Sequence, residues 1–291
     1  MKKTRAFRRL LKKGTVAMPG AFNALTALLA ERAGFQGIYI SGAGLANGLT
    51  GYPDIGLLTM TEVVAQARYI ANAVSIPAIA DADTGFGEVV NVARTVQEFE
   101  GAGVVGIHIE DQVLPKRCGH LAGIKLVPPR VMAEKIAAGV EAKEDEDFLI
   151  IARTDARSVK GLKEAVARAK VYLDAGADAI FPEALESREE FAEFARRVDA
   201  PLLANMTEFG QTPYMTVEEF EEMGYDMVIF PMTAFRIMAG AVEEGLRVLK
   251  REGTQKSLLA KMQTRHELYE LLGYKGYEEM DRRIARSGGK R

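Results

Sequence analysis

Eight short apolar runs alternate with eight helical patterns along the 291 residues, which predicts an α/β fold of the (β/α)8 TIM-barrel type. The apolar runs are nearly continuous, as expected for parallel strands buried on both faces. Several helical patterns end in glycine, the usual C-terminal stop of a helix. A doubly wound sheet is the alternative, but the count of eight strand–helix units favours a closed barrel.

The expected elements follow one another along the whole chain. Strands are expected at 15–19, 37–41, 77–81, 105–110, 148–153, 179–183, 201–206 and 226–231. Helices are expected at 22–34, 60–73, 89–103, 130–143, 161–176, 188–198, 216–224 and 233–253. Beyond them, residues 256–291 supply one or two further helices.

The start of the chain is basic, and its apolar residues fall on one helical face. Phe7, Leu10 and Leu11 share that face, which predicts a short amphipathic helix docked on the body of the protein. No low-complexity linker interrupts the chain. We therefore expect a single domain over residues 1–291, with an N-terminal helix at 1–13, the barrel at 14–253 and a C-terminal helical extension at 254–291.

Composition excludes several classes of protein. The net charge of −2 argues against a nucleic-acid binder, which is usually strongly basic. No apolar run approaches the roughly 18 residues of a membrane span, and the basic start lacks the apolar core of a secretory signal. One cysteine forbids an intrachain disulfide and suits a reducing compartment. The expected protein is soluble and cytoplasmic, with neither nucleic-acid nor membrane partners.

Polar residues gather where the predicted strands end, which is where barrels of this kind carry their functional groups. They are Ser41, Asp81, Asp83, Glu110, Asp111, Arg153, Glu183, Asn205, Thr207 and Arg236. Acids, cations and amides at one end of an otherwise apolar barrel indicate a binding or catalytic site rather than a purely structural protein.

The acids predict a hard divalent ion. Asp81 and Asp83 are two residues apart at a strand end, and Glu110 ends the next strand. Mg²⁺ favours a few carboxylates together with waters and substrate oxygens, and Mn²⁺ is the alternative ion. One aspartate could instead cap the helix that starts near Glu88. A soft-metal site is not expected, because the histidines and the cysteine show no ligand spacing.

Two arginines predict an anionic substrate. Arg153 and Arg236 can each bind a carboxylate through two hydrogen bonds, and ion pairs with barrel acids are the alternative for each. Arg265, near the C-terminal helices, is weaker evidence.

The only cysteine lies in the segment 115-PKRCGHLAG-123, which follows the strand that ends in Glu110. A lone buried cysteine is usually a small hydrophobe, but Cys118 is not in an apolar run. Lys116, Arg117 and His120 can tune its thiol, and Gly119 permits close backbone approach. We interpret the segment as a loop that brings a proton donor over a metal-bound polycarboxylate.

Eight motifs that occur in this order along the chain are similar to those of a known enzyme family: YISGAG, DADTGFG, IEDQ, KRCGH, ARTDA, FPEA, NMTE and FPMTAFR. From about Gly14 to Arg265 the chain resembles the 2-methylisocitrate lyase family of the isocitrate lyase and phosphoenolpyruvate mutase superfamily. The resemblance implies a (β/α)8 barrel whose terminal helix swaps between the subunits of a homotetramer. It also implies Mg²⁺-dependent retro-aldol cleavage of a tricarboxylate to pyruvate and succinate.

The resemblance also implies residue roles. Asp81 and Asp83 hold the metal, with Asp54 and Glu110 supporting that shell. Cys118 is the proton donor, Arg153 stabilises charge on the departing succinate, and Tyr39 is a candidate base, for which core packing is an equal alternative. The implied substrate-binding residues are Ser41, Gly42, Ala43, Cys118, Gly119, His120, Arg153, Glu183, Asn205, Met206, Thr207, Arg236 and Arg265. Ala43 departs from the glycine expected in this turn, which bears only on fine specificity.

Within the superfamily, substrate choice is expected to depend on an apolar wall at Phe181, Ile229 and Pro231, which suits an extra methyl group. Ordinary core packing is the alternative for these residues. The nearest rival activity is a sister lyase acting on dimethylmalate or isocitrate. A phosphonate-forming mutase is less consistent with the sequence, because such enzymes lack the Cys-Gly-His loop. A non-enzymatic barrel would not need the full set of acids and arginines.

Overall fold

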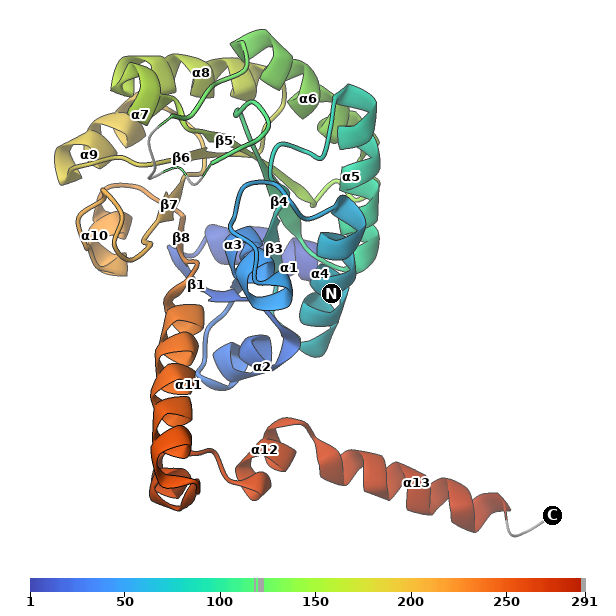
Figure 1. Ribbon diagram of the computed structural model, residues 1–291. Helices are drawn as coiled ribbons and strands as arrows, with labels where there is room; N and C mark the ends of the chain where they lie inside the picture. Colours follow the sequence, from blue (N-terminus) through green and yellow to red (C-terminus); the bar gives the residue numbers. More distant parts are fainter. Residues whose placement is uncertain (118, 120–122, 289–291) are drawn as a thin grey trace. The chain divides into compact units, whose positions relative to one another are not determined.

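A computed structural model describes residues 1–117, 119 and 123–288 of the chain, with side chains up to residue 285. The chain divides into two compact units, Met1–Phe235 and Arg236–Arg291. The first unit contains the eight strands, which form its centre with helices around them (Figure 1). The single-domain division expected from the sequence stays a prediction.

All eight strands are parallel, as predicted, and each begins and ends within two residues of its predicted bounds. They are β1 Val16–Ala21, β2 Ile38–Ile40, β3 Ala78–Asp81, β4 Gly106–Glu110, β5 Leu149–Thr154, β6 Ala179–Pro182, β7 Leu203–Asn205 and β8 Met227–Phe230. The strand order is β6-β5-β4-β3-β2-β1-β8-β7, and a parallel bridge from Ile180 to Leu202 joins the two ends. The (β/α)8 fold class is thereby confirmed.

The strands separate two cores. The inner core fills the barrel and includes Met18, Ile79, Ile151 and Phe181, all at most 1% exposed. The outer core lies on the opposite face of the sheet and receives the alternate strand residues, such as Ile107. Because successive side chains of a strand point to opposite faces, a residue's position along its strand decides whether it points into the barrel.

The eight predicted helices are present, each within two residues of its expected bounds. They are α2 Ala24–Arg32, α4 Met60–Ala73, α5 Val89–Ala102, α6 Pro129–Ala142, α8 Leu162–Asp174, α9 Arg188–Arg197, α10 Val217–Glu222 and α11 Thr233–Glu252. Local signals fix their starts: Thr59 and Glu62 form a reciprocal capping box at α4, and Ser187 caps α9. Three short helical segments were not predicted: α3 Gly42–Leu45, a π-helical turn at Ala46–Thr50 and α7 Ala156–Lys160.

The N-terminal helix α1, Lys3–Leu11, docks as predicted. Phe7 is fully buried in the inner core, and Leu10 and Leu11 pack against it. Charged residues on the rest of the helix pair with the loops around β5 and β6: Arg5 donates to Asp147 at 2.9 Å, and Arg8 donates to Asp178 at 2.7 Å. Because Asp147 and Asp178 precede their strands, α1 closes the end of the barrel opposite the strand C-termini.

The second unit is helical. After most of α11 come a 3-10 turn at Lys256–Lys261, α12 Arg265–Leu271 and α13 Tyr274–Gly288, which fulfils the expectation of one or two further helices. Many of its large apolar side chains are exposed, among them Leu246, Leu259 and Tyr277. No helix in the described part of the chain is long and apolar enough to cross a membrane.

Candidate active site

The C-terminal ends of the strands bring the predicted polar residues together. Side chains two residues apart on a strand point to the same face of the sheet. By this spacing, five polar residues follow residues whose side chains point into the barrel: Asp81, Glu110, Arg153, Glu183 and Asn205. They therefore point into the mouth of the barrel, above the apolar layers. Ladder register places Glu110 beside Arg153 on the neighbouring strand. The four charged residues are at least nine-tenths buried, so their charges interact through little water.

Arg153 is the central cation of this group. Its Nε and Nη2 donate to the two oxygens of Asp155 at 3.1 and 2.9 Å, and its Nη1 lies 3.4 Å from Glu110 Oε2. The guanidinium also lies over the Phe181 ring, 5.1 Å from its centroid. Asp155 therefore occupies one edge of the guanidinium, and Nη1 lies toward Glu110. The carboxylates raise the pKa of Arg153 well above its usual value, although burial alone would lower it.

Glu183 and Asn205 form a second pair at the mouth. The Asn205 amide donates to both Glu183 oxygens at 3.2 Å, and Glu183 lies 3.9 Å from Arg153 Nε. Gly119 is buried against this pair: a Cβ added there would come within 2.3 Å of Glu183 Cγ and 2.8 Å of Arg153 Nη2. Only glycine fits such a close approach, so Gly119 itself lies at the site.

A tight turn after β3 sets the two aspartates side by side. Asp83 has a positive φ of 47°, and its N–H donates to Asp81 Oδ1 at 2.9 Å. Aspartate tolerates this left-handed conformation because its side chain can bond locally. Burial alone would raise the pKa of Asp81, but electrostatic interactions with His108, Lys116 and Arg153 lower it to about 2. Burial and the neighbouring aspartates raise the pKa of Asp83 to about 6, against the effect of Lys116.

Lys116 lies at the site and forms ion pairs with two aspartates, which the sequence did not indicate. Its ammonium is buried, pairs with Asp54 and lies 2.7 Å from Asp83 Oδ1. Burial alone would lower the pKa of Lys116, but Asp83, Glu110 and Asp54 raise it well above its usual value. Instead of only tuning the neighbouring thiol, this lysine neutralises the acid cluster.

A buried tyrosine–histidine pair lies beneath the aspartates. Tyr39 Oη is 2.8 Å from His108 Nε2 and donates to Asp81 Oδ2 at 3.4 Å. Burial raises the pKa of Tyr39 well above its usual value and lowers that of His108 to about 4. Both are therefore neutral at pH 7. Sequence reasoning missed His108; its signal was a histidine within an apolar strand, on the same face as Glu110.

The segment after β2 presents its backbone to the aspartates. Ser41 caps α3 by accepting from the Gly44 N–H at 3.1 Å. The first N–H groups of a helix, here those of Gly42 and Ala43, have no partner within the helix. A Cβ at Gly42 would lie 2.6 Å from Asp81 Oδ2, so glycine is required there.

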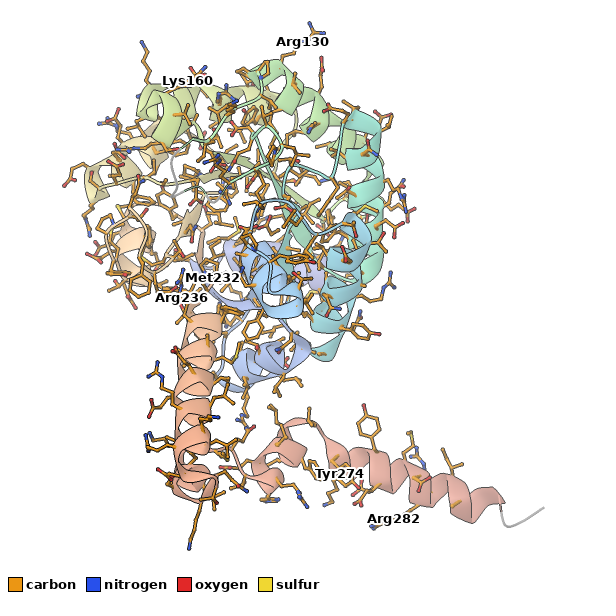
Figure 2. The ribbon with its side chains drawn as sticks, viewed as in Figure 1. Arg130, Lys160, Met232, Arg236, Tyr274 and Arg282 are labelled. Atoms are coloured by element: carbon orange, nitrogen blue, oxygen red, sulfur yellow. The ribbon has the colours of Figure 1, made fainter. Side chains whose placement is uncertain are left out.

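The remaining predicted residues are less directly placed. Met206 lies in the outer core, so only its main chain can line the pocket, whereas Thr207 is buried immediately after it. Arg236 and Arg265 belong to the second unit, in α11 (Figure 2) and at the start of α12, and their part in the site stays a prediction. Cys118 and His120 lie outside the described residues.

The residues expected to form an apolar wall are packed inside or near the barrel. Phe181 and Ile229 belong to the inner core, and the Phe181 ring packs edge-on against His108 with centroids 5.3 Å apart. Pro231 is half-buried, and its carbonyl lies so close to Gly20 that a Cβ there would be 2.0 Å away. Their role in selecting a substrate stays a prediction.

The donor set at the mouth fits a hard divalent cation. Both oxygens of Glu110 are buried and accept no hydrogen bond from the described residues, and two further carboxylates lie beside it. The described part of the chain contains no group of three His, Cys, Asp or Glu side chains that would hold an ion by itself. Mg²⁺ commonly takes one or two protein carboxylates and completes its shell with water and substrate oxygens.

Comparisons with known proteins agree with this arrangement. The phosphoenolpyruvate phosphomutase family model matches residues 7–250. The chain is 55% identical over 275 residues to a 2-methylisocitrate lyase of Aeropyrum pernix, covering 94% of this chain and 88% of that protein. A solved structure of 2,3-dimethylmalate lyase matches with a TM-score of 0.92 and 38% identity, over 98% of this chain and 96% of that one. A phosphonopyruvate hydrolase solved with oxalate and Mg²⁺ matches with a TM-score of 0.89 and 35% identity, over 97% and 99% of the two chains.

Proposed function

Because this chain belongs to the phosphoenolpyruvate phosphomutase family and is a carbon–carbon lyase, we propose that it cleaves 2-methylisocitrate to pyruvate and succinate. The observation that carries the proposal is the gathering of Asp81, Glu110 and Arg153 at the C-terminal ends of neighbouring strands, with Gly119 against Arg153, in a chain 55% identical to a lyase of that name.

We assign the metal site to Asp81 and Asp83, with Glu110 and Asp54 orienting the surrounding waters. Mg²⁺ held there supplies Lewis-acid stabilisation of the negative charge that develops on the substrate hydroxyl oxygen. Asp81 suits this role because its low pKa, about 2, keeps it ionised at neutral pH. Lys116 balances the remaining charge of the acids and must adjust its contacts with Asp54 and Asp83 when a second cation binds.

The proposed reaction breaks the bond between the hydroxyl-bearing carbon and its carboxylate-bearing neighbour. The hydroxyl loses its proton and becomes the carbonyl of pyruvate, and the electron pair of the broken bond moves to the succinate carbon. Arg153 stabilises the charge that spreads onto the adjoining carboxylate, through its Nη1 end. Cys118, next to Gly119, then donates its proton to that carbon.

Tyr39 remains the candidate for the proton acceptor. Its burial disfavours a resting phenolate, because the pKa of its phenol is raised. Tyr39 therefore acts only if it passes a proton on, and Asp81 and His108 are the partners within reach.

A comparison of two substrates tests the proposal. Pyruvate release from 2-methylisocitrate is expected to require Mg²⁺, to stop with EDTA and to exceed release of glyoxylate from isocitrate. The apolar side chains of Phe181 and Ile229 offer a dry contact for one methyl group, which is typically worth roughly 10- to 200-fold in kcat/KM. Both substrates are assayed under the same Mg²⁺ conditions.

The outcome separates the rival activities. Equal values, or a preference for isocitrate, would contradict the substrate assignment and leave the lyase chemistry standing. Faster cleavage of 2,3-dimethylmalate would transfer the assignment to the sister activity of the structurally similar lyase. Formation of a phosphonate from phosphoenolpyruvate would contradict carbon–carbon cleavage altogether.

We also propose that the enzyme is a homotetramer in which the C-terminal helices pack on neighbouring subunits. The support is the apolar stripe of α13, where Tyr274, Tyr277 and Met280 recur at helical spacing and are all exposed. Tyr274 is labelled in Figure 2. Such a stripe on a helix of a water-exposed unit marks a surface that another protein surface covers.

Charges on this stripe should break the assembly. The double variant Tyr277→Glu/Met280→Glu is expected to sediment as a smaller species than the tetrameric wild type, because buried unpaired carboxylates are costly at an interface. Glu279→Lys, on the polar side of the same helix, is the matched control and should remain tetrameric. A monomeric wild type in analytical ultracentrifugation would contradict the proposal.

The single cysteine is consistent with a reducing compartment, so the cytoplasm remains the proposed location.

A further inference from the structure

Next to the candidate active site lies a buried polar cluster that the proposed chemistry does not use. It consists of Asp111, which follows β4, and of Arg168 and Tyr172 on α8. All three side chains are at most 2% exposed. Arg168 and Tyr172 are four residues apart, so they share one face of their helix.

The Asp111 carboxylate is the centre of the cluster and accepts four hydrogen bonds. Its Oδ2 accepts from Arg168 Nη1 at 3.0 Å, from Tyr172 Oη at 2.8 Å and from Thr154 Oγ1 at 2.8 Å. Its Oδ1 accepts from the Asp155 N–H at 2.9 Å. Thr154 is the last residue of β5 and Asp155 follows it, so the carboxylate links helix α8 to the end of that strand.

One branch of the cluster leads to Arg153. The backbone of Asp155 is held by Asp111, and the carboxylate of Asp155 holds two nitrogens of Arg153. The Asp111 N–H also donates to the Arg153 carbonyl at 3.2 Å. Both the main chain and the guanidinium of Arg153 are thus fixed by groups that Asp111 binds.

The second branch leads to the two ends of the segment that carries Lys116 and Gly119. The Val127 N–H donates to the Asp111 carbonyl at 3.0 Å, and Arg168 Nη1 donates to the Val127 carbonyl at 2.9 Å. Gln112 and Leu126 form an antiparallel bridge just beyond. The segment therefore leaves and rejoins the barrel at the cluster.

We propose that Asp111, Arg168 and Tyr172 are positioning residues. They hold Arg153 and the two ends of the segment that carries Lys116 and Gly119 in a fixed position relative to each other. Core packing alone does not explain them, because apolar side chains of similar volume often stabilise a fold as well as a buried ion pair does. Here the hydrogen bonds converge on two active-site segments. A shift of either by about 1 Å is enough to slow a reaction that depends on their alignment.

The first test removes one hydroxyl from the cluster. For its catalytic readout this inference rests on the proposed function. Tyr172→Phe keeps the ring and is expected to lower kcat for 2-methylisocitrate by about 10-fold or more with a small change in KM. The matched control is Tyr225→Phe, a tyrosine 2% exposed whose hydroxyl donates to the Phe191 carbonyl at 3.3 Å, away from the site. The control should lose stability but keep kcat.

A double-mutant cycle then asks whether the effect passes through Arg153. Arg153→Lys keeps the charge but loses the paired hydrogen bonds to Asp155. In that background, Tyr172→Phe is expected to change kcat by less than about twofold, because the linkage it acts through is already broken. Thr154→Val, which also removes a donor from Asp111, should behave in the same way and serves if Tyr172→Phe folds poorly. Additive losses would overturn the proposal.

Hydrogen exchange provides a readout that needs no activity. Tyr172→Phe is expected to speed amide exchange at residues 111–117, 123–127 and 153–156, and Tyr225→Phe is not. Wild-type exchange at these residues in Tyr172→Phe, or an unchanged kcat, would overturn the inference. A wild-type enzyme that fails to cleave 2-methylisocitrate would contradict the proposed function alone, and the exchange result would still decide the role of the cluster.

Discussion

Turnover of 2-methylisocitrate in Asp81→Ala and in Asp83→Ala is expected to fall to the level of wild-type enzyme treated with EDTA. The two residues lie on one tight turn, and the proposed metal site uses both carboxylates, so removing either would leave that site incomplete. Loss of Lewis-acid stabilisation is worth several kcal/mol, or roughly 10²- to 10⁴-fold in rate. Titration calorimetry with Mg²⁺ should show weakened binding in both variants.

The control for these variants is a carboxylate at the other end of the barrel. Asp178 pairs with Arg8 and Lys143, so Asp178→Ala is expected to lower the free energy of unfolding while leaving Mg²⁺ binding and kcat unchanged. Wild-type rates in metal-free enzyme would rule out the assignment of Asp81 and Asp83 to a catalytic ion.

Replacing Cys118 with serine should lower kcat by roughly 10²-fold or more, the range for a lost general acid, while folding and Mg²⁺ binding persist. A hydroxyl is a much weaker acid than a thiol, so it delivers a proton to the succinate carbon far more slowly. The neighbouring Gly119 already lies against Arg153 and Glu183, which supports a donor at this position. The measurements are kcat, the unfolding midpoint and Mg²⁺ affinity.

A second variant separates acid chemistry from packing. Cys118→Ala has no proton to give and should be at least as slow as the serine variant, although it matches the small apolar character of a cysteine. If both variants turn over at the wild-type rate, the thiol is only packing, and another group must protonate the product.

The barrel could be predicted from the sequence because its strands are nearly continuous apolar runs whose ends coincide with polar residues. The sequence did not indicate the short helical segments that depend on tertiary contacts. The π-helical turn at Ala46–Thr50 contains Gly48, a poor helix former, yet Gly48 fits where a side chain would lie 3.3 Å from the Phe235 ring. Helix α7 has five residues, too few for a periodic pattern to be recognised.

The gathering of polar side chains at the mouth could also be predicted, because the C-terminal ends of parallel strands share one end of the barrel. Their partners could not. Lys116 pairs with Asp54 from 62 positions away, and His108 meets Tyr39 from 69 positions away. Such pairings depend on strand register and on the close approach of the chain at Gly42 and Gly119, which periodicity does not report.

The pairing of β1 with β8 affects how a newly synthesised chain folds. Residues 16–19 pair with 227–230, so the first strand leaves the ribosome about 210 residues before its partner. At typical synthesis rates that interval is roughly 10–40 s, during which Phe7 of α1 has no closed barrel interior to enter. Ring closure is therefore a late event that joins the oldest and youngest parts of the barrel, and a nascent chain interrupted before β8 exposes an open strand edge to its neighbours.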